Sequence, residues 1–391
     1  MKISENWLRT WVNPAVDSNT LSDQLTMLGL EVDDLLPAAK PFTGVVVGEV
    51  LTVEQHPDAD RLRVTTVNIG SGEPLQIVCG APNVRVGMKV PVATIGAVLP
   101  GDFKIKKGKL RGIESQGMLC GASEIDLEDK IDGLLELPVD APVGVDIREY
   151  LQLDDHVIDI SITPNRGDCF SIRGIAREIG VINQLTVTAP EINAVAATIA
   201  DEKKVVVSTE GCPRYLGRVI KNVNTKAATP EWMERALVRS GIRQHSILVD
   251  ITNYVLMELG QPLHAFDAAK IQGSVQVRQA NTAEKLVLLN EQEVELNEKV
   301  MVIADDEKAL AIAGIMGGLS SSVTDETQDI FLESAFFAPL AIAGRARSFG
   351  LHTDASQRYE RGVDFELPML AMHRASQLIA ELAGGEFGPI T

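Results

Sequence analysis

Hydrophobic positions recur at helical spacing at the start of the chain. Ser4 precedes a segment in which Trp7 and Trp11 fall on one face, and serine at such a position commonly caps a helix. Asn19 stands in the same way before a second periodic segment, which is closed by Gly29. The pattern predicts two short amphipathic helices followed by an extended run.

From about Phe42 the pattern changes to short β-rich runs separated by glycine and proline. These runs are GVVVGEVLTVEQ, LRVTTVNIG, LQIVCG, KVPVATIG and GDFKIKKGKLRG. Short strands at regular spacing with turn residues between them predict a small barrel, and five strands is the number in an OB-fold. We assign this barrel to residues 41–150.

Helical periodicity resumes after the barrel. Three isoleucines share one face of the segment, and Asp168 or Ser171 stands at its start as the cap. We expect this helix to pack against the N-terminal helices. Residues 1–40 and 151–190 would then form a single small α/β domain that the barrel interrupts.

The rest of the chain mixes predicted strands, such as YLGRVI and ILVDI, with helices, and predicts an α/β domain over residues 204–391. One helix has Thr229 as its cap, Pro230 in its first turn and Gly241 just past its end. Residues 186–203 are interpreted as a crossing or linker segment. The expected fold class is therefore α+β multidomain, with a small α/β N-terminal domain, an inserted OB-fold barrel and a mixed α/β domain.

Size and composition are those of a globular protein of two or three domains. The chain has 391 residues, of which 45% are hydrophobic and 23% charged. No apolar run approaches the roughly 20 residues needed to span a bilayer, and the N-terminus lacks the apolar region of a signal peptide. We expect a cytoplasmic protein without membrane contacts.

Cysteine spacing and net charge argue against two further classes of site. The four cysteines form no CxxC pair and have no histidine at metal spacing, so no metal site or disulfide framework is predicted. The net charge of -18 is the opposite of the usual footprint of a nucleic-acid binder. Contact with a nucleic acid would require a local basic patch.

One such patch lies in the predicted barrel, in the segment KIKKGKLR. It consists of Lys104, Lys106, Lys107, Lys109 and Arg111. Cations gathered in this way can contact phosphates. The alternative is a solvated, lysine-rich edge strand that discourages aggregation.

Ten motifs along the chain together carry a resemblance to a known family. In order they are MKISENWLRTWV, HPDADRL, IVCGAPNV, KLRGIESQGMLC, ITPNRGDCFSIRGIARE, VDITNYV, GQPLHAFD, GIMGG, ESAFF and TDASQRYERGVD. The chain resembles the β chains of bacterial phenylalanyl-tRNA synthetases over essentially its whole length. Those β chains are about twice as long, so the resemblance implies an N-terminal fragment with a tRNA-binding OB-like domain and an editing domain of the B3/B4 type.

The resemblance also implies partners and cofactors. The complete enzyme is expected to contain two α and two β chains and to attach phenylalanine to tRNA(Phe) with ATP and Mg²⁺. The aminoacylation site is expected in the α subunit, and no cofactor is expected in this fragment. The chain shows no P-loop spacing, which agrees with the absence of an ATP site here.

A phenylalanine-specific synthetase must reject tyrosine, which carries one additional hydroxyl. A hydrophobic pocket refuses an added hydroxyl by only about 10²-fold, so a second, hydrolytic site is one physical answer. The resemblance implies that Glu333, in FLESAFF, accepts the tyrosine hydroxyl, and that bound phenylalanine leaves this carboxylate unsatisfied. The alternative is a strand-end glutamate that faces solvent or pairs with an arginine.

The resemblance places His264, in GQPLHAFD, in the same editing pocket. We expect it to position the ester and a water rather than to abstract a proton. The alternative is a hydrogen-bonded core histidine. No Ser-His-Asp order stands out, and ester hydrolysis by a positioned water needs no protein nucleophile.

Further substrate-binding positions are implied by the resemblance. They comprise two polar residues at a predicted strand end, a glycine-rich turn, a pocket wall and a contact to the RNA terminus. In the same order, these are Thr252 and Asn253; Gly314, Gly317 and Gly318; Thr353 and Ala355; and Arg243. For the glycines, the alternative is an ordinary tight turn.

Two other functions compete with editing. The fragment could be a catalytically idle RNA-binding and assembly module that needs the α subunit and the missing C-terminal half. The barrel could also bind single-stranded nucleic acid by itself. Such barrels usually offer several stacking aromatics, whereas between Phe42 and Leu119 the only aromatic after the first strand is Phe103.

Overall fold

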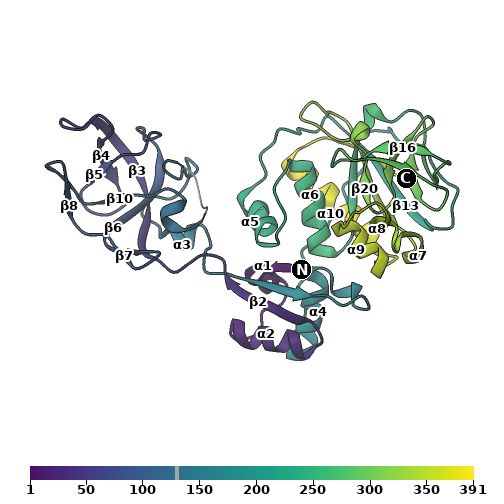
Figure 1. The fold of residues 1–391 in the computed structure, drawn as a ribbon, viewed down its shortest axis with the longest axis horizontal. Coiled ribbons are helices and arrows are strands. Elements are labelled where there is room, and N and C mark those ends of the chain that lie inside the picture. The colour runs from purple at the N-terminus through teal and green to yellow at the C-terminus, as the bar shows by residue number, and fades with distance from the viewer. Residues whose placement is uncertain (128–131) are drawn as a thin grey trace. The chain divides into compact units, whose positions relative to one another are not determined.

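The computed structural model describes residues 1–127 and 132–391, which form two compact units (Figure 1). One unit comprises Met1–Leu35 and Val157–Thr391, and the other comprises Leu36–His156. The second unit is thus inserted into the chain of the first. The α+β class with an inserted barrel is confirmed.

The N-terminal part of the first unit combines three helices with a three-stranded sheet. The helices are α1 (Glu5–Trp11), α2 (Ser18–Met27) and α4 (Ile172–Asn183), and the sheet order is β1 (Lys2–Ser4), β11 (His156–Ser161), β2 (Glu31–Pro37). Ser4 caps α1 as predicted, since its hydroxyl accepts a hydrogen bond from Trp7 N at 3.1 Å. Ser171 likewise caps α4.

The predicted cap of the second helix is wrong. Asp17, not Asn19, caps α2, because the Asp17 carboxylate accepts a hydrogen bond from Thr20 N at 2.8 Å. Both residue types are good caps, so the pattern alone could not separate two candidates two positions apart.

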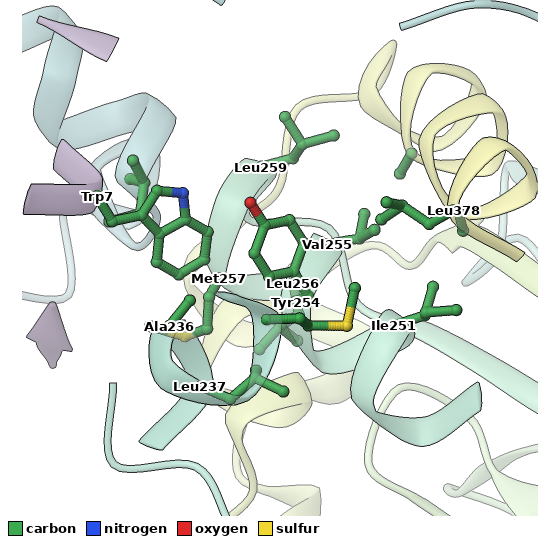
Figure 2. Close-up of a cluster of buried hydrophobic side chains, with 14 of the residues drawn as sticks. Trp7, Ala236, Leu237, Ile251, Tyr254, Val255, Leu256, Met257, Leu259 and Leu378 are labelled. Carbon is green, nitrogen blue, oxygen red and sulfur yellow. The ribbon is translucent and has the colours of Figure 1, made fainter. Parts of the chain in front are cut away.

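The N-terminal helices share a core with the region that follows residue 204. The Trp7 ring stacks on Tyr254 of α6 (Ile247–Leu259), with ring centroids 4.7 Å apart, and Figure 2 shows both among the buried side chains. The segment 186–203 crosses this core without regular structure: Thr188 N donates to Trp11 O, and Thr198 N donates to Phe387 O. The predicted division between these two domains stays a prediction.

The α/β region contains two larger sheets. The four-stranded sheet is antiparallel and has the order β14 (Leu263–Asp267), β21 (Ile330–Phe336), β13 (Arg214–Lys221), β22 (Glu386–Ile390). The five-stranded sheet has the order β12 (Val205–Val207), β15 (Val275–Gln279), β18 (Met301–Ala304), β19 (Ala309–Ile312), β20 (Met316–Gly317). Strands β16 (Glu284–Val287) and β17 (Glu293–Leu296) form a hairpin.

The other helices of this region are α5 (Glu231–Arg239), α7 (Pro339–Ile342), α8 (Arg345–Ser348), α9 (Asp354–Arg361) and α10 (Leu367–Leu382). The predicted Thr229 cap of α5 is wrong, because Pro230 occupies the cap position and the Thr229 hydroxyl donates to Asp250 at 2.6 Å. Gly241 does lie just past the helix end, with φ of +75°. Among the described residues, no helix has the length and apolarity that crossing a membrane requires.

The strand predicted at ILVDI is also wrong, since these residues begin α6. Nearly every residue of α6 is buried. A helix buried on all sides presents a continuous apolar run, which periodicity cannot distinguish from a buried strand.

The inserted unit is built on one curled sheet with the order β10 (Gly117–Leu119), β6 (Lys89–Leu99), β3 (Thr43–Gln55), β4 (Arg63–Asn68), β5 (Leu75–Cys79). Strand β7 (Phe103–Lys104) adds to β6, and β8 (Gly108–Leu110) pairs with β9 (Ile113–Ser115). Gln116 N donates to Gln76 O at 2.8 Å, and Val78 N donates to Ser115 Oγ at 3.1 Å. These bonds join the segment at the start of β10 to β5, so the sheet curls into a barrel.

Candidate functional site

The candidate site is organised around Glu333 on β21, an inner strand of the four-stranded sheet. His264 of β14 lies directly opposite it on one side and Gly217 of β13 on the other. Opposite residues of antiparallel strands project to the same face, so His264 and Glu333 are side-chain neighbours. Glu333 is only 7% exposed.

The Glu333 carboxylate has a partner within the protein. The Tyr215 hydroxyl donates a hydrogen bond to Glu333 Oε2 at 2.7 Å. Glu333 therefore neither faces solvent nor pairs with an arginine. Tyr215 thus satisfies one of the two carboxylate oxygens, and the effect of bound phenylalanine on the other stays a prediction.

Burial dominates the electrostatics of Glu333. It raises the pKa of this carboxyl to about 7, and the hydrogen bond from Tyr215 opposes the rise. Burial, and then the nearby Glu333, raise the pKa of the Tyr215 hydroxyl well above its ordinary value. At neutral pH Glu333 thus lies close to its titration midpoint, and Tyr215 is a neutral donor.

His264 is held in an apolar environment. Its ring meets Phe266 edge-on, with centroids 4.4 Å apart, and within the described parts of the chain its buried Nε2 has no hydrogen-bond partner. Burial lowers the pKa of His264 to about 4, so the imidazole is neutral at physiological pH. An unpaired buried nitrogen does not fit the alternative of a fully hydrogen-bonded core histidine.

Both side chains line one cavity. Its wall is mostly apolar and includes the turn between β19 and β20 and the first turn of α9. Of the predicted site residues, the structure brings together at this cavity His264, Glu333, Gly314, Gly317 and Ala355.

The glycines have different steric roles. A Cβ at Gly317 would lie 2.7 Å from His264 Nε2, so a side chain is excluded where the backbone meets the imidazole. Gly314 has φ of +69°, and a Cβ there would crowd Phe337 and Tyr359. Gly318 does not line the cavity; its missing side chain instead makes room for the carbonyl of Leu310.

Thr353 ties the cavity wall to α9. Its hydroxyl accepts a hydrogen bond from Ser356 N at 3.1 Å and donates one to Ile315 O at 2.9 Å. Because Ile315 lines the cavity, Thr353 acts on the wall from behind it. Ala355, in the first turn of the same helix, lines the cavity directly.

Three predicted residues do not line the cavity. Thr252 and Asn253 are inside α6 and not at a strand end, and the Thr252 hydroxyl donates to Val249 O at 2.8 Å. Arg243 is exposed in the segment between α5 and α6. None of the three lines the cavity that contains His264.

Sequence reasoning missed Tyr215, Gln261 and Tyr359. Tyr359 lines the cavity and donates to Ala335 O at 3.0 Å, while Gln261 is fully buried and donates to the Tyr359 hydroxyl at 3.1 Å. A tyrosine within a predicted buried strand, such as YLGRVI, could have indicated a polar site residue, because a buried phenol hydroxyl needs a hydrogen-bond partner.

The basic patch of the barrel is fully on the surface. Lys104, Lys106, Lys107, Lys109 and Arg111 are all exposed. Lys107 forms an ion pair with Glu114 at 2.8 Å. Lys104 and Lys106 line a groove of the barrel together with Phe103, whose side chain is 59% exposed.

One group of candidate metal ligands occurs within the described residues, namely Asp168, Cys169 and Glu178. Arg166 forms ion pairs with Asp168 at 3.1 Å and with Glu178 at 3.0 Å. The Arg166 guanidinium therefore already neutralises the negative charge that these two carboxylates would otherwise present to a metal cation.

Comparisons with known proteins agree along the chain. A family model described as "B3/4 domain" matches residues 211–384, and one described as "Putative tRNA binding domain" matches residues 45–146. The similar proteins include the phenylalanine–tRNA ligase beta subunits of Acinetobacter baylyi, Psychrobacter arcticus and Pseudoalteromonas translucida. They are 82%, 66% and 61% identical over 100% of this chain and over 49%, 50% and 49% of their own lengths.

The chain therefore spans about half the length of the curated relatives that it matches. Both domain models and the full coverage of this chain point to the same group of proteins. The chain belongs to the family of phenylalanine–tRNA ligase β subunits.

Proposed function

We propose that the α/β region of this chain is an editing site that hydrolyses Tyr-tRNA(Phe). One observation carries the proposal: a buried carboxylate, Glu333, and a neutral imidazole with an unpaired nitrogen, His264, lie opposite each other and line one cavity. Buried polar groups without a full set of partners are costly unless a ligand uses them.

Glu333 would select tyrosine through its free oxygen. Oε2 accepts the bond from Tyr215, and in the described structure Oε1 accepts none. A carboxylate oxygen can accept a hydrogen bond from the phenol of a bound tyrosine, and such charge-assisted bonds are stronger than neutral ones. Phenylalanine has no donor to offer, and the small side chain of Ala355 leaves room for the ring.

The reaction is ester hydrolysis by water. Water attacks the carbonyl carbon, the bond between that carbon and the ribose oxygen breaks, and the ribose hydroxyl is regenerated with a proton. With a pKa of about 4, His264 is a weak base at neutral pH. Its role is therefore to position the ester and the water through Nε2.

The RNA would reach this site along surfaces outside the cavity. We assign Lys104, Lys106, Lys109 and Arg111 of the barrel to phosphate contacts, with a smaller contribution from the paired Lys107. Arg243 is assigned to the RNA terminus. Thr252 and Asn253, on α6, would act through packing rather than through direct contact with the amino acid.

The complete protein is proposed to be a β subunit that assembles with an α subunit, as two copies of each, in the cytoplasm. In that assembly the α subunit would attach phenylalanine to tRNA(Phe) with ATP and Mg²⁺. The described chain would contribute proofreading and RNA contacts.

A deacylation assay with preformed Tyr-tRNA(Phe) tests the proposal. The full-length β subunit, assembled with its α subunit, should clear the ester, while His264→Ala and Glu333→Ala should each lose at least about tenfold in rate. Phe-tRNA(Phe) measures the background. Equal rates of Tyr-tRNA(Phe) deacylation by all three proteins would contradict the assignment of the site.

A second function is favoured by the net charge of -18, which predicts weak attraction for RNA in isolation. In this case the isolated chain binds tyrosine but turns over no ester until the α subunit and the rest of the β subunit deliver tRNA. Tyrosine titration into the isolated chain, with Glu333→Ala as the control, separates the two. Binding without hydrolysis favours the assembly module.

A further inference from the structure

We propose that Tyr215 is a positioning residue for the recognition of tyrosine: its hydroxyl holds Glu333 Oε2 so that Oε1 is presented to the cavity as the acceptor for the substrate phenol. This inference rests on the proposed editing function. Tyr215 is not among the residues that line the cavity. Its phenol hydroxyl donates to one of the two oxygens of the carboxylate that would recognise the substrate phenol.

The strand register makes Tyr215 the diagonal neighbour of Glu333. On β13, Tyr215 pairs with Ala335, and Gly217 pairs with Glu333 itself. Diagonal neighbours on one face lie roughly 7–8 Å apart at Cα, which a tyrosine side chain can span. The hydroxyl therefore reaches Oε2 while both residues stay in the regular ladder.

Gly217 clears the position directly beside Glu333. A Cβ on Gly217 would collide with the Phe331 ring, which lies over this glycine. The Phe331 ring offers no hydrogen bond, so on this side Tyr215 is the only donor to the carboxylate among the described residues. On the other side His264 offers its unpaired Nε2 to the cavity.

The groups around Glu333 are neutral at physiological pH. They are Tyr215 on β13, Cys212 just before it, His264 on β14 and Tyr359 on α9. Burial raises the pKa of Cys212 to about 12 and lowers that of His264 to about 4, and it raises the pKa of both tyrosines. In the part of the chain that the structure describes, no cation offsets the burial of Glu333, so the Tyr215 hydrogen bond is what opposes the rise of its pKa.

Loss of the Tyr215 hydroxyl should change the pKa of Glu333 in a definite direction. Tyr215→Phe removes the bond that favours the ionised carboxylate, so the pKa of Glu333 rises further above its value of about 7. Glu333 then stays protonated to higher pH. A protonated acid is a weaker acceptor, so the preference for Tyr-tRNA(Phe) over Phe-tRNA(Phe) should appear only at higher pH.

The test is the pH profile of this preference in the full-length enzyme with its α subunit, from pH 6 to pH 9. For wild type the ratio of the two kcat/KM values should rise with pH through about 7. For Tyr215→Phe the midpoint should move up by about one pH unit or more. Glu333→Gln should show a low ratio at every pH.

A matched control removes a different buried phenol hydroxyl. Tyr254→Phe alters the core shared with Trp7, outside the cavity lining, and should leave the midpoint unchanged. If Tyr215→Phe proves unstable, 3-fluorotyrosine at position 215 keeps the ring and makes the hydroxyl a stronger donor. The midpoint should then move down.

The outcomes separate the two proposals. A Tyr215→Phe profile that superimposes on wild type, while Glu333→Gln loses its preference, overturns the role of Tyr215 and leaves the editing site in place. An unmoved midpoint with 3-fluorotyrosine has the same meaning. A wild-type preference in Glu333→Gln overturns the editing assignment itself.

Discussion

Gly317 and His264 meet so closely that the position at 317 has no room for a side chain. A Cβ on Gly317 would lie 2.6 Å from His264 Cε1 and 2.7 Å from Nε2. Gly317 thereby sets where the imidazole sits beside Glu333. The relationship links a glycine of strand β20 to a histidine 53 positions earlier in the chain.

Gly317→Ala should displace the His264 ring and reduce Tyr-tRNA(Phe) deacylation by about tenfold or more, at a stability cost of about 1–3 kcal/mol from overpacking. Deacylation rates and urea unfolding measure the two effects. The reverse test is the double variant Gly317→Ala with His264→Ala. Removal of the imidazole relieves the clash, so the stability cost of Gly317→Ala should be smaller in this background. A single variant with unchanged rate would show that the ring position is not set by this contact.

Glu333→Gln should change how stability depends on pH. The pKa of Glu333 is raised from 4.5 to about 7, so the folded state binds this proton more tightly than the unfolded state. Its contribution to stability is present below pH 4.5 and is lost as the pH rises through 7, by about 3 kcal/mol in total. Glutamine does not ionise, so the variant should gain stability relative to wild type over this range.

Chemical unfolding at pH 4.5, 6 and 7.5 measures the effect in Glu333→Gln. A matched comparison is Glu366→Gln, whose carboxylate is exposed and pairs with Arg214 at the surface. That substitution should show little pH-dependent change. Parallel pH profiles for wild type and Glu333→Gln would contradict the raised pKa.

Trp7→Ala should destabilise the whole first unit. Trp7 is 8% exposed and stacks on Tyr254, so its removal should cost about 3–5 kcal/mol. Trp232 meets the same tyrosine edge-on but is 42% exposed, and Trp232→Ala should cost clearly less. Thermal unfolding compares the two variants.

If the N-terminal helices and the α/β region share one cooperative core, Trp7→Ala lowers the single transition of that unit. A separate early transition, with the rest unchanged, would instead support the division into the two domains expected from the sequence.

Charge reversal in the barrel should weaken tRNA binding. Lys106→Glu places a negative charge in the groove next to Phe103, and each lost phosphate contact should reduce the slope of log affinity against log salt by about one. Lys107→Glu should have a smaller effect on the slope, because Lys107 is already paired with Glu114. An unchanged slope in Lys106→Glu would favour the solvated edge strand.

Local patterns were sufficient for elements whose signals are short-range. The Ser4 cap followed by Trp7 predicted α1, and β-rich runs between glycines predicted the barrel strands. The same reasoning failed for Thr229 and for α6, because a cap has several chemically equivalent candidates and a fully buried helix has no polar face to report its period.

The sequence by itself determined the fold class, the inserted barrel and, through the order of its motifs, the family. Only the tertiary structure decided that Tyr215 holds Glu333, that Gly317 abuts His264 and that Thr252 does not line their cavity. Propensity and periodicity act within a few residues along the chain. Strand register and packing instead bring together β13, β14 and β21, which are far apart in sequence, and only their pairing places one hydroxyl against one carboxylate oxygen.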